Sequence, residues 1–479
     1  MKKILIYTPL LSLVLAVSCT KDFDKINSNP NAPETVSAQF LLSNVIWEAA
    51  DGNARQGWLA GNMLAQHTSN IEFQPVDRYD MGTNVDYWNT LYRLLNDIQS
   101  MDEAEGSNDA YRAIGKVLKA WIGSQLTDLW ADVPWTQAIQ GQSAGNFTPE
   151  YDTQQMIYTG SGGILELLDE AVATLSNTSN QSVQGDIMFG GDLSAWLRFA
   201  NSLKVRYLLR ISDKQDVSGE LQALVNLGNL MTSNADNAVV PYLSSSPNQW
   251  FIFNERIGRY TDLRMSTTID SVLERYNDPR IGVYFKPTAN SANTANPVYD
   301  GIPNGLSRAS QNAYDLGDVS LLGSVFRDVP NGIDAQFMLY GELQLALAEA
   351  ASRGLIGGAA ATYYQEGITA MFNYYGEEVP GTYLLQPEVA LSGVNDLEKI
   401  LTDEDIPYLR ENLLIESVKS AFGESRGGQK RKPSDEAWEW IISEDRELPF
   451  SFNQCCLACG VDPDKMLDWL RYYKRKFMS

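Results

Sequence analysis

The sequence has very few of the residues that carry most catalytic and metal chemistry. Its 479 residues include one histidine, His67, and four cysteines. Ser/His and Cys/His catalysis needs a histidine base, and no placed nucleophile accompanies His67, so a structural or surface role is the simpler interpretation. Asp and Glu are plentiful, but abundance alone does not identify a glycosidase pair. We therefore predict no catalytic residue, no metal site and no cofactor.

Basic residues are also scarce. The chain has 37 Lys and Arg against 60 Asp and Glu, a net charge of −23. This balance argues against nucleic acid as a partner, because phosphates require a basic surface, and against adhesion to anionic lipid through charge alone. With 44% hydrophobic and 10% aromatic residues, the chain is too apolar to be disordered. We expect a globular protein.

Long apolar runs are missing as well, since none reaches the ~20 residues that a membrane-spanning helix needs. The uncharged segment 4–17 follows two lysines and precedes Ser18 and Cys19. A basic start, a short apolar segment and a small residue before a cysteine are typical of a lipoprotein signal peptide. We expect residues 1–18 to be removed and Cys19 to carry lipid. The alternative is an ordinary secretory signal, because Ala16 is weaker than Leu at the third position before the cut.

The residues after this cysteine differ from the rest of the chain. Segment 19–35 is polar and contains Pro30 and Pro33, which disfavour helix and central strand. We interpret this segment as a tether between the anchor and the folded body, which begins near residue 36.

A change in composition marks the other end of that body. Residues 403–479 contain 27 charged residues in 77, against 70 in the preceding 402. They also contain Cys455, Cys456 and Cys459, whereas the body has no cysteine after Cys19. Zinc normally needs four ligands and no second pair follows, so packing of small residues on one helix is favoured over a zinc or redox site. We predict a separate helical tail.

Helical periodicity dominates the body. Apolar residues recur every three or four positions over 88–98, over 111–129 and over 196–207, and a Gly-Ser-Asn break at 106–108 separates the first two runs. We predict an antiparallel pair of helices followed by a third amphipathic helix. We expect Trp88, Trp121 and Trp196, which lie on these stripes, to belong to the core.

Two further helices are predicted nearer the C-terminus. Segment 334–352 is rich in small residues and ends before Gly354, and an aromatic stripe follows over 364–375. Small residues at the crossing favour a tetratricopeptide-like hairpin, although no strict period of about 34 residues is visible. Strand candidates are short, at 238–240 and 283–285. The predicted fold is mainly α, with tetratricopeptide-like helix pairs, long irregular loops and a few short strands.

Irregular, aromatic-rich segments between about residues 240 and 330 are the candidates for a ligand surface. Exposed indole and phenol rings pack well on sugar C–H faces, and polar side chains at the rim bind sugar hydroxyls. The candidate binding residues are Trp250, Tyr260, Tyr299, Asn248, Asn254 and Arg264. The alternative for each aromatic residue is that it packs a loop against a helix.

Several segments together carry a family resemblance. They are CTKDFDKINSNPN (19–31), TDLWADVPW (127–135), GGDLSAWLRFANSLKVR (190–206), NDPR (277–280), GIPNGL (301–306), AEAASRG (348–354) and LEKILT (397–402). In this order they resemble the SusD/RagB family of surface lipoproteins, in particular the SusD-like branch typical of Bacteroidetes. The resemblance covers about residues 19–402.

This resemblance implies a helical fold with loops that form a ligand surface, at the outer face of the outer membrane. It also implies a partner, a TonB-dependent transporter of the SusC kind. The lipoprotein would bind an oligosaccharide or a peptide and deliver it to the transporter without breaking any bond.

The sequence departs from the family after Thr402, because nothing in 403–479 fits the family's final helices. We interpret 36–402 as a C-terminally truncated nutrient-binding domain joined to an unrelated tail, by a genomic rearrangement, by faulty assembly of the sequence or as a genuine fusion. The missing helices would leave apolar surface uncovered.

The sequence leaves two other functions open. A surface glycosidase or peptidase would require a paired carboxylate or a metal cluster, which the sequence does not locate. A scaffold that braces the transporter would require no ligand site at all.

Overall fold

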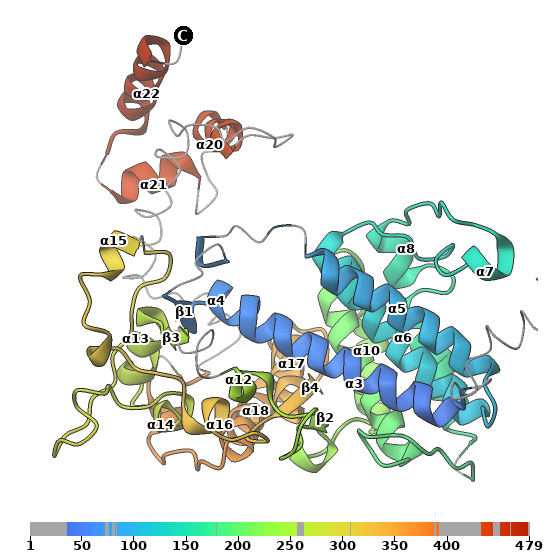
Figure 1. The fold of residues 1–479 in the computed structure, drawn as a ribbon. Helices are drawn as coiled ribbons and strands as arrows, with labels where there is room; N and C mark the ends of the chain where they lie inside the picture. Colours follow the sequence, from blue (N-terminus) through green and yellow to red (C-terminus); the bar gives the residue numbers. More distant parts are fainter. Residues whose placement is uncertain are drawn as a thin grey trace, which may run out of the picture. The chain divides into compact units, whose positions relative to one another are not determined.

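The computed structural model describes residues 36–71, 76–78, 82, 84–178, 180–255, 263–306, 308–387, 389–391, 433–443, 451–459 and 461–477. The chain divides into two compact units, Met1–Leu384 and Leu385–Ser479 (Figure 1). Among the described helices, none combines the length and the apolar character required to cross a membrane.

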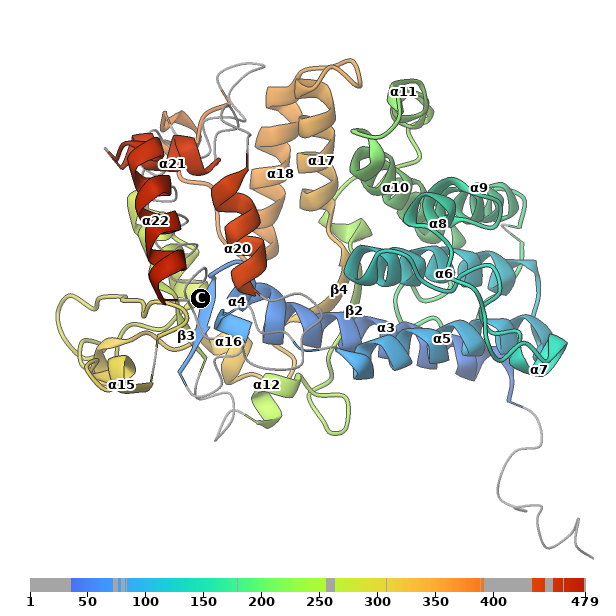
Figure 2. The ribbon, with the colours of Figure 1, turned by 90° about the horizontal axis from the view of Figure 1, so that it is seen from above.

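Long helices form one half of the larger unit, and each packs on the next (Figures 1 and 2). In packing order they are α3 (Ala38–Gln56), α5 (Val85–Glu103), α6 (Asp109–Trp130), α9 (Ile164–Leu175), α10 (Leu193–Ile211), α17 (Tyr340–Ser352) and α18 (Ala360–Tyr374). The mainly helical fold predicted from periodicity is confirmed, including the α5–α6 pair and α10.

Local capping sets where two of these helices begin. The Asn108 side chain accepts hydrogen bonds from the N–H groups of Ala110 and Tyr111, at 2.9 and 3.2 Å. Asp192 caps α10 in the same way through Ser194 and Ala195. These caps satisfy N–H groups that have no partner within the helix, so the polar break before α6 acts as a helix start.

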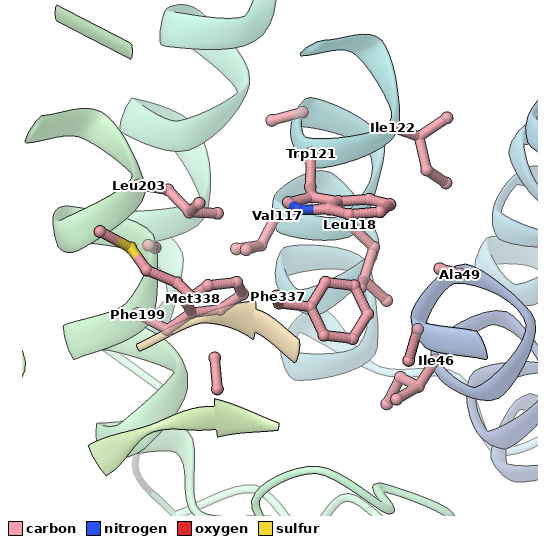
Figure 3. Close-up of a cluster of buried hydrophobic side chains, with 14 of the residues drawn as sticks. Ile46, Ala49, Val117, Leu118, Trp121, Ile122, Phe199, Leu203, Phe337 and Met338 are labelled. Atoms are coloured by element: carbon pink, nitrogen blue, oxygen red, sulfur yellow. The ribbon is translucent and has the colours of Figure 1, made fainter. Parts of the chain in front are cut away.

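The core of the larger unit lies where α3, α6 and α10 meet a short strand, β4 (Asp334–Met338) (Figure 3). The Trp121 and Phe337 rings pack edge to face with centroids 4.8 Å apart, and Phe199 lies 6.2 Å from Phe337. Trp121 and Trp196 are fully buried, whereas Trp88 is only half-buried against this core. A strand therefore contributes a central side chain to a helical core.

The strand β4 differs from the sequence prediction, which placed 334–338 inside a helix. It pairs antiparallel with β2 (Ala238–Pro241), so Val239 lies opposite Gln336 and Pro241 opposite Asp334. Burial alternates along β4, with Ala335 and Phe337 buried, and this period of two fits a strand. The predicted strand 238–240 is confirmed as part of β2. The predicted strand 283–285 is wrong, because residues 281–284 form a helical turn, α14 (Ile281–Tyr284).

Helices α17 and α18 form the predicted hairpin with small residues at the crossing. A Cβ on Gly341 would lie 2.7 Å from Met371, and one on Gly367 would lie 2.8 Å from Leu345. Each glycine also faces the other's carbonyl oxygen, 3.1 Å from the added Cβ. The close approach of the two backbones therefore requires glycine at both positions.

The other half of the larger unit consists of loops and short elements. Strands β1 (Thr68–Asn70) and β3 (Leu263–Met265) pair antiparallel there, and Asn304 of the GIPNGL segment contacts β1 by donating to the Thr68 carbonyl at 2.8 Å. The remaining elements of this unit are η1 (Gly57–Gly61), α4 (Asn62–Leu64), η2 (Val76–Arg78), α7 (Gly141–Ala144), α8 (Gln154–Thr159), α11 (Ser218–Leu227), η3 (Asn234–Asp236), α12 (Phe251–Asn254), α13 (Thr267–Arg275), α15 (Arg308–Gln311), η5 (Leu316–Asp318) and α16 (Ser324–Arg327). A last short turn, η6 (Tyr383–Leu385), lies at the boundary of the two units.

The smaller unit contains three described helices, α20 (Pro433–Ile442), α21 (Phe452–Ala458) and α22 (Pro463–Phe477). Its core includes Trp438, Phe452 and Leu470 together with the buried Cys455 and Cys456. The cysteines thus pack inside a helical core, as the simpler sequence interpretation favoured. Within the described residues there is no group of His, Cys, Asp and Glu that could hold a metal ion.

Candidate ligand-binding site

A cavity of about 630 Å³ lies beside β4 in the larger unit. We call it cavity A. Its volume falls in the range of about 300–1,000 Å³ that is usual for ligand sites. Its lining combines aromatic rings with amides and one carboxyl group: Trp58, Phe326, Tyr374, Tyr375, Asn53, Asn62, Asn331, Gln336 and Asp334, with Ala54, Gly57, Val283, Val325, Gly332 and Ile333 between them.

One wall of cavity A comes from a π-helical turn. The helix α3 continues into η1 (Gly57–Gly61), where the wider turn changes the direction of the following side chains. Trp58 is half-buried there, with its ring 4.9 Å from Phe326 and 5.5 Å from Trp250. Packing on two aromatic rings holds this indole in place at the cavity wall.

The floor of cavity A comes from β4. Asp334 and Gln336 are half-buried and alternate with the buried Ala335 and Phe337, so they share the strand face away from the core. The Asn53 side-chain N–H donates to the Gln336 carbonyl at 2.9 Å, which ties α3 to the strand. Because that bond uses the backbone, it leaves the Gln336 side chain free for other contacts.

Tyr374, at the C-terminal end of α18, completes the polar part of the site. Gln336 Nε2 donates to the Tyr374 hydroxyl at 3.2 Å. Desolvation raises the pKa of the Asp334 carboxyl, and a hydrogen bond from Tyr374 opposes that rise. Desolvation together with the nearby Asp334 charge also raises the pKa of Tyr374. Gln336, Tyr374 and Asp334 thus lie together as a partly dehydrated polar group in the lining of cavity A.

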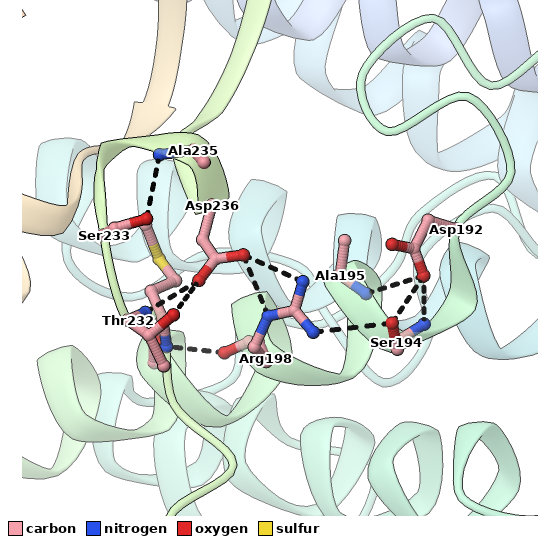
Figure 4. A network of polar contacts seen from close by, with 10 residues as sticks. Asp192, Ser194, Ala195, Arg198, Thr232, Ser233, Ala235 and Asp236 are labelled. Carbon is pink, nitrogen blue, oxygen red and sulfur yellow. Dashed lines mark hydrogen bonds and ion pairs between the residues drawn. The ribbon is translucent and has the colours of Figure 1, made fainter.

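A second cavity, cavity B, has a volume of about 700 Å³ and is lined in part by Asp334 and Tyr374 as well. Other polar residues in its wall are Asp192, Arg198, Asn234, Asn237 and Asn373. Figure 4 shows the network behind this wall. Two guanidinium nitrogens of Arg198 contact Asp236 Oδ1 at 2.8 and 3.0 Å, and Thr232 donates to Asp236 Oδ2 through its N–H and its hydroxyl, both at 2.7 Å.

A third cavity, of about 490 Å³, is lined by Trp121, Gln125, Arg206, Glu342 and Met371 among others. Arg206 forms a bidentate ion pair with Glu342, at 2.6 and 2.7 Å, and also donates to the Phe337 carbonyl at 2.9 Å. Its donors are thus used to join α10, β4 and α17, which is a structural role.

Trp250, the leading sequence candidate, is fully buried. Its indole N–H donates to the Phe326 carbonyl at 2.7 Å, and its ring contacts those of Tyr242 and Phe251 as well as Trp58. No face of this ring is open to a ligand, so its position favours the packing alternative. The buried Trp250 ring packs against the Trp58 ring.

The other sequence candidates do not gather into one site. Asn254 is exposed at the end of α12, where its N–H donates to the Trp250 carbonyl at 3.3 Å. Asn248 and Tyr299 are half-buried, and Arg264 is buried in β3. None of these residues lines a cavity described above. Tyr260 and Cys19 lie outside the described residues, and His67 is exposed.

The cavity residues were missed for identifiable reasons. The stripe that contains Tyr375 predicted a helix correctly, but gave no sign that the end of this helix borders a cavity. The segment PNGIDAQF (330–337) carried a usable signal, because a turn sequence precedes alternating polar and apolar residues. Trp58 lies in GWLAG, where glycines on both sides of an aromatic residue indicate an irregular helix end.

Comparisons with known proteins agree with the fold. A family model described as "Starch-binding associating with outer membrane" matches residues 30–407. A SusD homolog from Bacteroides fragilis is 24% identical, covers 80% of this chain and 80% of its own, and has a TM-score of 0.62. A SusD-like protein from Bacteroides thetaiotaomicron is 24% identical, covers 73% of this chain and 72% of its own, and has a TM-score of 0.59. A chitin-binding SusD homolog from Flavobacterium johnsoniae is 22% identical, covers 72% of this chain and 72% of its own, and also has a TM-score of 0.59. No curated protein matches this chain.

Proposed function

Because the chain belongs to the SusD-like family, described as starch-binding and associating with the outer membrane, we propose that it is a cell-surface receptor for an oligosaccharide. The observation that carries this proposal is the composition of cavity A. Aromatic rings stand beside amide and carboxyl groups, which are the partners that sugar C–H faces and hydroxyls require. Trp58 and Tyr374 are the proposed contacts, in place of the buried Trp250.

The receptor would work on the outside of the cell without chemical turnover. In this proposal Cys19 carries the lipid that holds the protein at the outer membrane, and a TonB-dependent transporter of the SusC kind receives the ligand. The family's description and the resemblance of segment 19–31 support both steps. Among the described residues that line cavity A, Asp334 has the one carboxyl group, whereas glycoside hydrolysis uses two, so binding fits this cavity better.

Calorimetric titration tests ligand binding. Suitable probes are maltooligosaccharides, because the family is described as starch-binding, and chitooligosaccharides, because one structural relative binds chitin. We expect saturable binding without product formation, and Trp58→Ala should weaken it about tenfold or more. Tyr151→Ala is the matched control, because Tyr151 is 65% exposed and lines none of the cavities. Turnover of the probe, or equal affinity in both variants, would contradict the proposal.

Metabolic labelling with a radioactive fatty acid tests the anchor. We expect label on the wild-type protein in the membrane fraction and none on a Cys19→Ala variant, which should be released. Copurification with an outer-membrane barrel after mild detergent extraction would support the transporter step. Wild-type protein that carries no label and fractionates with the cytosol would disprove surface attachment.

A further inference from the structure

Cavities A and B have two lining residues in common. Asp334 and Tyr374 border both, so the two spaces meet at this pair. Each cavity alone is of ordinary ligand-site size, at about 630 and 700 Å³. Their common boundary includes the Asp334 carboxyl and the Tyr374 hydroxyl, which accepts a hydrogen bond from Gln336 Nε2 at 3.2 Å.

The two cavities also share a floor. Cross-strand partners lie on the same face of a sheet, and β2 and β4 pair Val239 with Gln336 and Pro241 with Asp334. Gln336 and Asp334 line cavity A, whereas Val239, Pro241 and Asp334 line cavity B. One face of this small sheet therefore borders both spaces.

The charges along these two cavities do not favour an anionic ligand. Asp334 forms no ion pair with any residue that the structure describes. Arg198, the cation in the wall of cavity B, is already paired with Asp236 at 2.8 Å. Asp192 adds another carboxylate to that wall, where it caps α10. A carboxylated or sulfated sugar would meet net negative charge here, whereas neutral hydroxyls can donate to Asp334.

We infer that cavities A and B form a single groove for a neutral oligosaccharide long enough to span both, with Asp334 and Tyr374 at its middle. This inference rests on the proposed function and adds two properties to it, the length of the ligand and its lack of charge. A sugar chain that crosses the junction meets hydroxyl and carboxylate partners there, with the Trp58 ring on the side of cavity A.

A ladder of oligosaccharides tests the inference on the full-length protein. Malto- and chitooligosaccharides from the disaccharide to the heptasaccharide are titrated, together with oligogalacturonates of the same lengths as the charged comparison. For the neutral series that binds, we expect affinity to rise about tenfold or more between the shortest members and those that fill both cavities, and then to level off. The oligogalacturonates should bind about tenfold or more weakly than neutral chains of equal length.

Variants at the junction locate the effect. Tyr374→Ala should flatten the length dependence, because chains that cross the junction should lose more affinity than the shortest sugar that binds. Asp334→Asn should reduce the difference in affinity between neutral and charged oligosaccharides. Asp86→Asn is its control, because Asp86 is exposed and lines neither cavity. Thermal unfolding of each variant shows whether a change in binding arises from loss of the fold.

The outcomes separate this inference from the proposed function. Three results would overturn the inference and leave sugar binding intact. The affinity could be independent of chain length, it could show the same length dependence in Tyr374→Ala as in the wild type, or it could be as high for oligogalacturonates as for neutral chains. If no oligosaccharide binds to folded wild-type protein, both the function and the inference are wrong.

Discussion

Trp58 and Trp250 lie side by side, with ring centroids 5.5 Å apart, yet they are suited to different tasks. Trp250 is fully buried and its N–H is satisfied by the Phe326 carbonyl, whereas Trp58 is half-buried at the wall of cavity A. The difference lies in which elements cover each ring, and not in the residue type. At the scale of single residues, burial therefore separates supporting aromatic residues from candidate ligand contacts.

The first prediction concerns the stability of this aromatic pair. Trp250→Ala should lower the free energy of unfolding by about 3–5 kcal/mol, because it removes a large buried ring and leaves a cavity. Trp58→Ala should lower the free energy of unfolding by less, because part of the Trp58 ring already faces solvent. Denaturant titration of both variants and of Tyr151→Ala measures the difference. A Trp250→Ala protein as stable as the Tyr151→Ala control would refute the packing role.

A second prediction uses the buried carboxyl group of Asp270. Desolvation, with the charges of Glu274 and Asp300, raises its pKa from 3.8 to about 6, although the Gly301 N–H donates to Oδ2 at 3.0 Å. Below pH 3.8 the group is protonated in the folded and unfolded states alike, so it changes nothing. Above that pH the unfolded chain ionises first, so the stability contributed by this group falls as the pH rises towards 6.

Asp270→Asn should therefore gain stability relative to the wild type as the pH rises from about 4 to 7. The full pKa shift corresponds to about 3 kcal/mol, at about 1.4 kcal/mol per unit, and part of it is already present at pH 4, so the expected relative gain between pH 4 and pH 7 is about 2 kcal/mol. Chemical denaturation at pH 4 and pH 7 provides the comparison, with Asp86→Asn as the exposed control. A stability difference independent of pH would show that Asp270 ionises normally.

At the scale of elements, the α17–α18 hairpin and β4 show opposite relations to local sequence. The hairpin follows its local pattern, because small residues and helical periodicity agree with the observed helices. The strand β4 departs from the helical prediction, because pairing with β2 and burial of Phe337 against Trp121 outweigh a weak local preference. Strand formation depends here on a partner nearly a hundred residues away.

The hairpin supplies the third prediction. Alanine usually stabilises a helix relative to glycine, by up to about 1 kcal/mol. At Gly367 it should instead destabilise the protein by about 1–3 kcal/mol, because the added Cβ would lie 2.8 Å from Leu345 and 3.1 Å from the Gly341 carbonyl oxygen.

Gly219 in α11 is the matched control, because an added Cβ there would meet nothing within 4 Å. Gly219→Ala should leave stability unchanged or increase it slightly. Thermal unfolding of the two variants gives the comparison. If Gly367→Ala is as stable as Gly219→Ala, the helices do not cross as closely as the structure indicates.

At the scale of the whole molecule, the chain consists of two compact units with very different cores. The core of the larger unit spans helices α3 to α18. The described core of the smaller unit contains far fewer side chains. Its buried members are Trp438, Ile441, Phe452, Cys455, Cys456 and Leu470. The predicted boundary at residues 402–403 falls within the second unit, Leu385–Ser479, and lies outside the described residues, so it stays a prediction.

The fourth prediction follows from this division. Calorimetry of the full chain should show two transitions, with the smaller unit unfolding at lower temperature because its described core buries fewer apolar side chains. A chain that ends after Ala390 should lose that transition and keep the other at nearly the same temperature. A single transition, or a large shift of the main one on truncation, would show that the two units unfold together.

Much of the architecture could be predicted from the sequence, because its signals are local. Helical periodicity and the break at 106–108 identified α5 and α6, and the small residues at 341–351 indicated a hairpin. The candidate site could not be predicted in the same way. Its walls come from α3, η1, β4 and the end of α18, which are far apart along the chain.

The sequence by itself determined the helices and the family, because capping, periodicity and motif order are properties of short segments. Only the tertiary structure decided that 334–338 is a strand, that Trp250 is buried, and that Asp334 and Tyr374 meet between two cavities. The physical reason is that burial and cross-strand pairing depend on distant residues brought together by folding. A side chain's neighbours in space, more than its neighbours in sequence, decide whether it supports the core or faces a ligand.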